Sequence, residues 1–250
     1  MIDYVVQYQC SFFASNAGLE PTPDTIRLLL DTLGDKGFVP TTVQEYALMD
    51  GPFVRPRLQL QFSTSDQAWN IAFETPRVLI THENVAGTNI GTPREFISEA
   101  AEMYARILGE IPLIGNRLSY VTSGLLPDMP KDTLDEIGGS MMSNPQFYVD
   151  HPPHEWTTRR VSRVETMMGE RNEKFNVITD IGRVRGSIRL KDSNVSIDRI
   201  QVSFDINTFQ LNTSPRFGRE DITSFLESAV SITEQISGQL QSDVFGRYGS

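Results

Sequence analysis

The segment His151-Pro152-Pro153-His154-Glu155 places two imidazoles and a carboxylate close together in the chain. Histidine nitrogens and carboxylate oxygens are common ligands of divalent transition metals. The prolines, however, favour an extended loop over the helical His-Glu-x-x-His arrangement of zinc peptidases. No third strong ligand lies nearby in the sequence. We therefore expect a loop between two elements and no bound metal, with His151, His154 and Glu155 as weak candidate ligands.

The arginines between residues 157 and 199 are a second group that could do chemistry. Ten of the 22 basic residues lie there, against six acidic ones. Along residues 183–190 the alternation of a strand puts the arginines and Ser187 on one face and apolar residues or glycine on the other. Guanidinium groups suit carboxylates and phosphates, so this face is a candidate surface for an anionic ligand or an acidic partner. The candidate residues are Arg159, Arg163, Arg183, Arg185 and Arg189.

The alternative interpretation is a solvated sheet face. In that case the arginines pair across neighbouring strands with Glu165, Glu170 or Asp180. Runs of charge usually belong to such faces, and we favour this interpretation over a binding surface.

Other catalytic signals are weak. His82 lies in a predicted strand, where a half-buried or solvated histidine is expected, and Cys10 lies in an aromatic strand, where a buried and unreactive thiol is expected. No nucleophile elbow, phosphate-binding loop or dinucleotide fingerprint is present. Gly182 and Gly186 lie inside a strand pattern and suggest a bulge. We expect no cofactor, and the motifs give no support for an enzyme.

The composition is that of an ordinary globular protein, with 250 residues of which 39% are hydrophobic and 22% charged. No apolar run approaches the roughly 20 residues of a membrane-spanning helix. The chain begins with a strand-like pattern and no basic region, so we expect no secretory signal. A single cysteine fits a reducing compartment. We therefore predict a cytoplasmic protein.

The net charge of −10 argues against a general nucleic-acid binder, because phosphate contacts need clustered positive charge.

The element pattern of residues 2–111 starts with a strand at 3–13. A helix follows, with Thr22 as its cap, Pro23 in the first position and Gly34 at its exit. Thr92 and Glu95 then form a capping box that opens a long closing helix. Between the two helices, alternation predicts strands at 43–49, 57–62, 69–73 and 78–85.

Residues 116–240 show the same order with weaker signals. The predicted elements are a strand at 117–125, a helix at 130–137 closed by Gly138 and Gly139, strands at 157–168, 174–181, 183–190 and 195–206 with a turn near Gly182, and a last helix after Gly218. We therefore predict an α+β fold of two similar halves, 1–112 and 113–250. Each is an antiparallel sheet with a strand, a short helix, three to four strands and a long helix. The halves share element order and not residue identity, so duplication and convergence both remain open.

The order of several motifs resembles a sporadically distributed, uncharacterised prokaryotic family of proteins of about this length. The motifs are Gly-Phe-Val-Pro at 37–40, Leu-Gln-Leu-Gln-Phe at 58–62, Trp-Asn-Ile-Ala-Phe-Glu at 69–74, Arg-Val-Leu-Ile-Thr at 77–81, Pro-Arg-Glu-Phe at 93–96, Arg-Leu-Ser-Tyr at 117–120, Val-Ser-Phe-Asp-Ile at 202–206 and Asp-Val-Phe at 243–245. The resemblance implies no established activity and carries no catalytic residue. It does imply a patchy distribution like that of defence and toxin-neutralising genes.

Two functional hypotheses follow. The first is a non-enzymatic macromolecule-binding protein, a component or neutralising partner in a defence or toxin–antitoxin module, whose acidic charge suits a basic protein partner. The second is a sensor or enzyme for a small anionic, nucleotide-like ligand. Its pocket would lie between the two halves, with the arginines of 183–189 or the 151–155 loop contributing. The long last helix and open sheet edges also predict a possible homodimer.

Overall fold

The computed structural model describes residues 1–15, 17–48, 54–142, 145–190 and 193–248, with backbone alone for residues 45–48, 54–57, 188–190 and 193. Its elements, in chain order, are β1 (Tyr4–Phe13), α1 (Pro23–Leu33), the 3-10 helix η1 (Gly34–Lys36), β2 (Phe38–Leu48), β3 (Val54–Thr64), β4 (Trp69–Glu74), β5 (Arg77–Glu83), α2 (Pro93–Glu110), β6 (Arg117–Leu125), α3 (Lys131–Met141), α4 (Gln146–Asp150), β7 (Trp156–Met168), β8 (Arg171–Leu190), β9 (Ser193–Thr208), α5 (Arg219–Asp243) and the 3-10 helix η2 (Phe245–Arg247).

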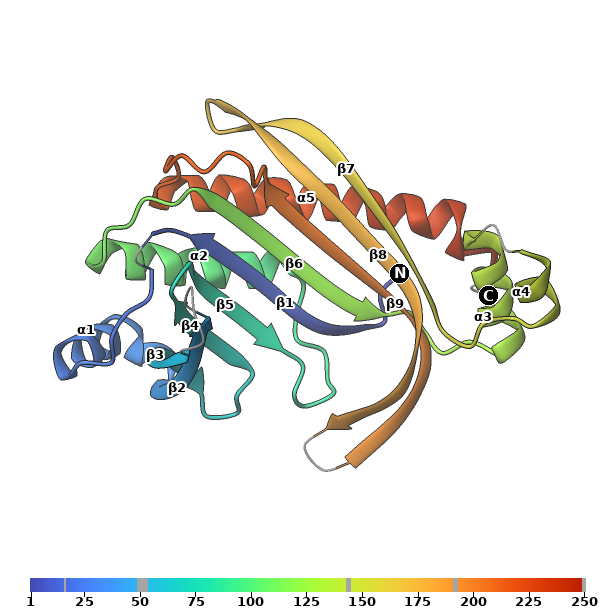
Figure 1. Ribbon diagram of the computed structural model, residues 1–250, viewed down its shortest axis with the longest axis horizontal. Helices are drawn as coiled ribbons and strands as arrows, with labels where there is room; N and C mark the ends of the chain where they lie inside the picture. The colour runs from blue at the N-terminus through green and yellow to red at the C-terminus, as the bar shows by residue number, and fades with distance from the viewer. Residues whose placement is uncertain (16, 49–53, 143–144, 191–192, 249–250) are drawn as a thin grey trace.

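The strands form one nine-stranded antiparallel sheet in the order β2-β3-β4-β5-β1-β6-β9-β8-β7 (Figure 1). This confirms the α+β class and the antiparallel sheet. β1 and β6 pair at the centre, with Cys10 opposite Tyr120. One hydrophobic cluster contains β1 residues together with Phe175, Ile206 and residues of α5, so the core crosses position 112.

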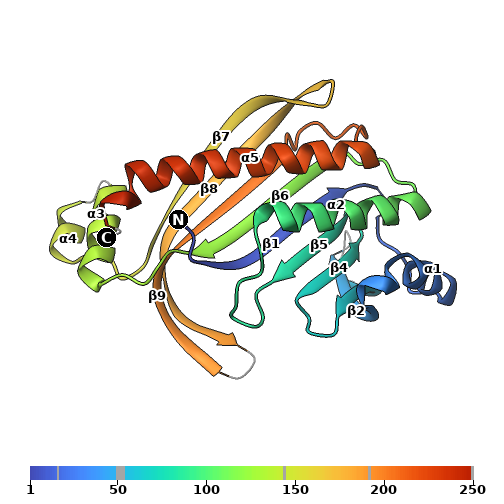
Figure 2. The same ribbon diagram turned by 180° about the vertical axis from the view of Figure 1, so that it is seen from behind.

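The helices pack on one face of the sheet. Figures 1 and 2 show α2 and α5 side by side along that face. At one end, Leu29 of α1 joins the main core cluster, and at the other end Ile137 of α3 packs with Ile181 and Ile200 in a second cluster. Among the described residues, no helix has the length and apolar character needed to cross a membrane.

The opposite face of the sheet is polar, and no described helix covers it (Figure 1). A chain of hydrogen bonds crosses three strands there. Asn176 Nδ2 donates to Asn207 Oδ1 at 3.1 Å, Asn207 Nδ2 donates to Asp205 Oδ1 at 2.9 Å, and Ser119 Oγ donates to Asp205 at 3.3 Å. We call this surface the open face.

The predicted helix starts are confirmed. Thr22 Oγ1 accepts from Thr25 N at 3.2 Å. The capping box of α2 is complete, because Thr92 Oγ1 accepts from Glu95 N at 3.2 Å and Glu95 Oε2 accepts from Thr92 N at 2.7 Å. These motifs are local, and each satisfies amide groups that the first helical turn leaves free.

The predicted turn near Gly182 and the bulge at Gly182 and Gly186 are wrong. β8 runs unbroken through both glycines, and its pairing with β9 is continuous from Phe175 to Leu190. Position 182 requires glycine because the backbone of β7 approaches it closely: a Cβ there would lie 2.5 Å from the Trp156 carbonyl oxygen. α3 also continues past Gly138 and Gly139 instead of ending at 137, and the proline-rich region contains a further short helix, α4.

Candidate functional site around Trp156

The structure separates the candidate arginines onto the two faces of the sheet. Trp156 of β7 lies opposite Arg183 of β8, and Arg159 lies opposite Asp180. Arg183 is opposite Trp156 and, like Arg185, points toward the helices. Arg159 is three positions after Trp156, and positions three apart on a strand point to opposite faces, so Arg159 and Arg163 lie on the open face. The five arginines therefore do not form one surface. Arg189 belongs to the backbone of β8, and its side chain lies outside the described residues.

Arg183 is buried, contrary to the expected exposed face. Its side chain is 1% exposed. Its Nε and Nη2 donate to the two carboxylate oxygens of Asp198 at 2.6 and 2.8 Å, and its Nη1 donates to Asp135 Oδ1 at 2.6 Å. The guanidinium thus joins α3 to β8 and β9. Three of its five N–H donors are thus occupied within the chain, and its burial keeps it from serving as an exposed site for an anionic ligand.

The two carboxylates around Arg183 are held in their charged form. Hydrogen bonds from Arg183 lower the pKa of Asp198. Hydrogen bonds from Lys131, at 2.5 Å, and then from Arg183 lower the pKa of Asp135. The cluster is therefore ionised at neutral pH.

Arg159, Arg163 and Arg185 interact with neighbouring side chains. Arg159 Nη1 lies 2.7 Å from Asp180 Oδ2, a pairing across strands of the kind expected for a solvated face. Arg163 Nε donates to Asn176 Oδ1 at 3.2 Å, and its guanidinium lies 4.9 Å from the centre of the Phe209 ring. Arg185 is exposed, with its Nε 3.4 Å from Asp198. Exposed pairs of this kind contribute little stability, about 0–1 kcal/mol.

The His151–Glu155 segment leads the chain from α4 into β7. The His151 ring packs against Phe147 with centroids 5.0 Å apart, and His154 and Glu155 are exposed. Within the described part of the chain, no group of three or more histidine, cysteine, aspartate or glutamate side chains could hold a metal ion.

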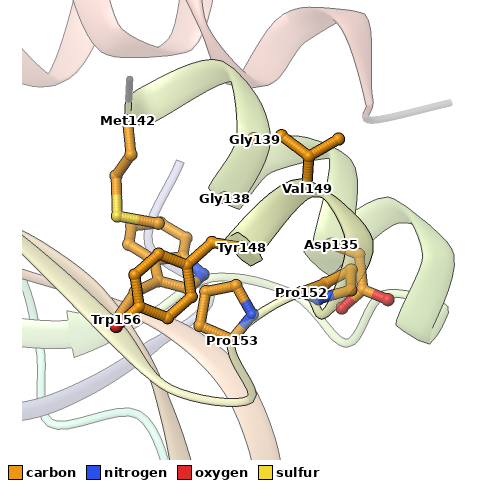
Figure 3. Close-up of a pocket in the computed structure, with 9 residues that line it drawn as sticks. All are labelled: Asp135, Gly138, Gly139, Met142, Tyr148, Val149, Pro152, Pro153 and Trp156. Atoms are coloured by element: carbon orange, nitrogen blue, oxygen red, sulfur yellow. The ribbon is translucent and has the colours of Figure 1, made fainter. Parts of the chain in front are cut away.

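A pocket of about 310 Å³ lies where this segment meets α3 and α4 (Figure 3). Tyr148, Pro153 and Trp156 gather at one end of it, and the carboxylate of Asp135 lies at the other. Trp156 is 7% exposed, and its Nε1 has no hydrogen-bond partner among the described residues. The volume is at the lower end of the range of about 300–1,000 Å³ typical of ligand pockets. Aromatic rings beside a carboxylate suit a cation on an apolar stem.

The segment that carries the Trp156 pocket is acidic. Residues 131–155 contain five acidic residues and one basic residue. The carboxylates of Asp132, Glu136, Asp150 and Glu155 are exposed and make no ion pair with any residue that the structure describes. α4 adds exposed apolar surface, with Phe147 64%, Tyr148 47% and Val149 59% exposed. Asp135, the carboxylate that lines the pocket, is paired with Lys131 and Arg183, so the uncompensated negative charge lies on the elements that surround the pocket.

Sequence reasoning missed Trp156 and the role of Gly138. The glycines of α3 were interpreted as a helix stop, whereas a Cβ at position 138 would lie 2.6 Å from Trp156 Nε1. Gly138 therefore lets the helix approach the indole. A tryptophan directly after a proline-rich loop was the available signal.

A second cavity, of about 720 Å³, lies at the junction of the two predicted halves. It is lined by β1, the loop before α2, Thr122 of β6 and residues of α5, and Arg94 of α2 bridges to Glu234 of α5 at 2.5 Å. The hydroxyl of Tyr120, a neighbour of Thr122 in β6, is buried without a hydrogen-bond partner in the described residues. Burial raises the pKa of this hydroxyl well above its ordinary value.

The two other candidate reactive groups are poorly placed for chemistry. Burial raises the pKa of the Cys10 thiol to about 12, so it stays protonated at neutral pH. His82 stacks on Trp69 with centroids 4.2 Å apart, and burial lowers its pKa, so it stays neutral.

Comparison with known proteins adds little to this description. Among solved structures, the chain is similar to the rolling circle replication initiator protein of Geobacillus stearothermophilus, with a TM-score of 0.34 and 9% identity over 95% of this chain and 83% of that chain. At that TM-score the likeness carries no argument. No family model and no curated protein match the sequence, so the family resemblance remains a prediction.

Replacing Arg183 by methionine leaves Asp198 and Asp135 without their shared cation. We expect a loss of about 3 kcal/mol at pH 7, the lower end of the range for broken buried pairs, because both carboxylates stay partly hydrated. The folded-state pKa values are lowered, so the stabilisation is full above the unfolded-state pKa of about 3.9 and is lost as pH falls through the folded values. Urea unfolding at pH 7 and pH 3 measures this. An equal difference between wild type and variant at both pH values would contradict it.

Gly138→Ala tests the contact between α3 and Trp156. The new methyl group collides with Nε1, and we expect destabilisation by about 1–3 kcal/mol, as for other overpacked sites. Gly139→Ala is the matched control, since nothing lies within 4 Å of its added Cβ and alanine favours the helix by about 0.5–1 kcal/mol. Thermal unfolding of both variants checks the prediction, which fails if the two shift the midpoint in the same direction.

Proposed function

We propose that this chain is a non-enzymatic macromolecule-binding protein whose partner is a basic protein. The observation that carries the proposal is the Trp156 pocket, an apolar and aromatic hollow whose elements hold four exposed carboxylates that make no ion pair among the described residues. A lysine or arginine side chain would place its stem against the rings and its charge among the carboxylates. Buried aromatic pockets of this kind are where interfaces concentrate their binding energy.

The charge of the helices supports the same partner. α1, α2 and α5 together contain eleven acidic and four basic residues. A basic protein approaching the helix-covered side therefore meets a negative field, which speeds encounter and sets orientation. We propose a prokaryotic defence or toxin–antitoxin module as the setting, in which an acidic protein of this kind neutralises a basic one.

The similarity of the two halves is part of the proposal. β1 and β6 lie together at the centre, β5 flanks β1 and β9 flanks β6, and each half ends in a long helix. We propose that the halves derive from one duplicated unit. Related sequences would test this, because duplication predicts that residues 4–110 and 117–243 align with each other once many homologues are compared.

The partner proposal predicts that charge reversal at the pocket abolishes binding. The variant carries Asp132→Lys and Glu136→Lys, both at exposed positions of α3. The control carries Asp24→Lys and Asp31→Lys, exposed positions of α1 with the same change in charge. We expect wild type and control, tagged in the native host, to retain the same basic protein and the α3 variant to lose it. Recovery of this chain alone, or equal capture by all three, would overturn the proposal.

A second candidate function is binding of a small anionic ligand in the cavity between the halves. The size of the cavity favours it, because about 720 Å³ lies within the range of about 300–1,000 Å³ typical of ligand pockets. A ligand at 100 times its Kd would raise the free energy of unfolding by about 2.7 kcal/mol. Thermal-shift screening with nucleotides tests this candidate. No shift with any nucleotide would remove it.

A further inference from the structure

The outer edge of β7 is long, regular and free. β7 is the last strand of the sheet, and its thirteen residues pair without interruption with β8, while no other strand of the described residues pairs with its outer edge. It contains no proline. Val161 is 58% and Met167 59% exposed along it. An exposed edge of this length presents unpaired backbone groups that can accept another strand.

We propose that β7 pairs with β7 of a second copy of this chain, in antiparallel register about a two-fold axis at Ser162. This inference is independent of the proposed partner, which would use the Trp156 pocket on the helix-covered side.

Symmetry restricts the possible registers. A two-fold axis perpendicular to the sheet keeps every side chain on its own face, and side chains alternate between faces along a strand. Opposed residues must therefore be separated by an even number of positions, so the axis passes through a residue and not between two. Each register is then defined by the residue at the axis.

Between residues 159 and 165, charge excludes every axis except Ser162 and Val164. An axis at Arg160 or Arg163 places that arginine opposite its own copy, and an axis at Val161 places Arg159 opposite Arg163 twice. Like charges directly opposed destabilise a strand pair. An axis at Ser162 instead places Arg159 opposite Glu165 twice, with each arginine of one copy facing the carboxylate of the other. An axis at Val164 also avoids like charges, through two pairs of Arg163 with Glu165.

The length of the paired region separates the registers that charge leaves open, since an axis at 156–158 or 166–168 pairs five residues of the strand or fewer. Ser162 is the midpoint of Trp156–Met168, so an axis there pairs all thirteen residues of the strand. An axis at Val164 pairs residues 160–168 alone. The Ser162 register also opposes Thr158 to Thr166, a favourable cross-strand pair.

The packing beneath β7 agrees with an additional strand. A hollow of about 440 Å³ lies between β7 and α5, lined by Ser162 and Val164 on the strand and by Ile236 and Leu240 on the helix. The helix layer thus leaves space under the edge of the sheet, into which side chains of a second β7 can reach. The resulting dimer has one eighteen-stranded sheet, twice the nine strands of one copy, with a continuous open face.

Cysteine crosslinking tests the axis. In Ser162→Cys the two new thiols lie opposite each other, with Cβ atoms about 4.5–5.5 Å apart, within reach of a disulfide after a small adjustment. Cys10, the single native cysteine, is buried and does not interfere. We expect mild oxidation to convert Ser162→Cys to a covalent dimer and to leave Val164→Cys monomeric. Crosslinking of Val164→Cys alone, or of neither, would overturn the proposal.

Charge exchange supplies an independent measurement on the protein without cysteines. Arg159→Glu and Glu165→Arg alone each oppose like charges, so we expect at least a tenfold weaker dimer by sedimentation. The double variant restores the pairs and should return to within about threefold of wild type. These variants still fold, because both residues make only exposed pairs in the monomer. Wild type that sediments at 28.1 kDa at tens of micromolar, or rescue by Arg163→Glu with Glu165→Arg, would show the register to be wrong.

Discussion

The pairing of β1 with β6 is the constraint on which the rest of the structure depends. Tyr8, Cys10 and Phe12 of β1 and Leu118 and Tyr120 of β6 are buried on one face of this pair. Because successive side chains of a strand point to opposite faces, the residues between these positions point to the other face of the sheet, and they are polar. α2 and α5 must therefore cover the same face and contact each other. The Tyr104 hydroxyl of α2 fixes this arrangement, since it lies 3.0 Å from the Cys10 carbonyl oxygen and 2.9 Å from that of Val78.

A one-sided helix layer also explains how the open face exists without cover. Asn207 is 1% and Asn176 6% exposed on that face, yet their amides hydrogen-bond to each other and to Asp205. Buried polar groups cost free energy when they lack partners, and these have them within the chain. Arg159 of this face pairs with Asp180 as well. These hydrogen bonds and ion pairs let this part of the open face remain uncovered by helices.

Features that depend on residues close together in the chain, such as helix caps, could be predicted from the sequence. Features that depend on contacts between distant residues could not. Thr92 and Glu95 are three residues apart, so their capping box could be inferred directly. Whether β8 stops or continues at Gly182 depends on β7 and β9, which are distant in the chain, and the glycine is needed because the Trp156 carbonyl approaches it. Arg183 was assigned to the correct strand but to an exposed face, since its two partners lie 15 and 48 positions away.

Trp156 connects the two surfaces to which we assign interactions. It is the first residue of the edge strand β7 and also part of the pocket. Its position is fixed from two sides, by Gly138 of α3 and by the pairing opposite Arg183, whose ion pairs with Asp135 and Asp198 join α3 to the sheet. A buried, doubly paired guanidinium resists displacement, because breaking it leaves charges without partners. The pocket therefore lies at the start of the edge strand, on the helix side of Trp156, while the outer backbone groups of β7 remain available to a second strand.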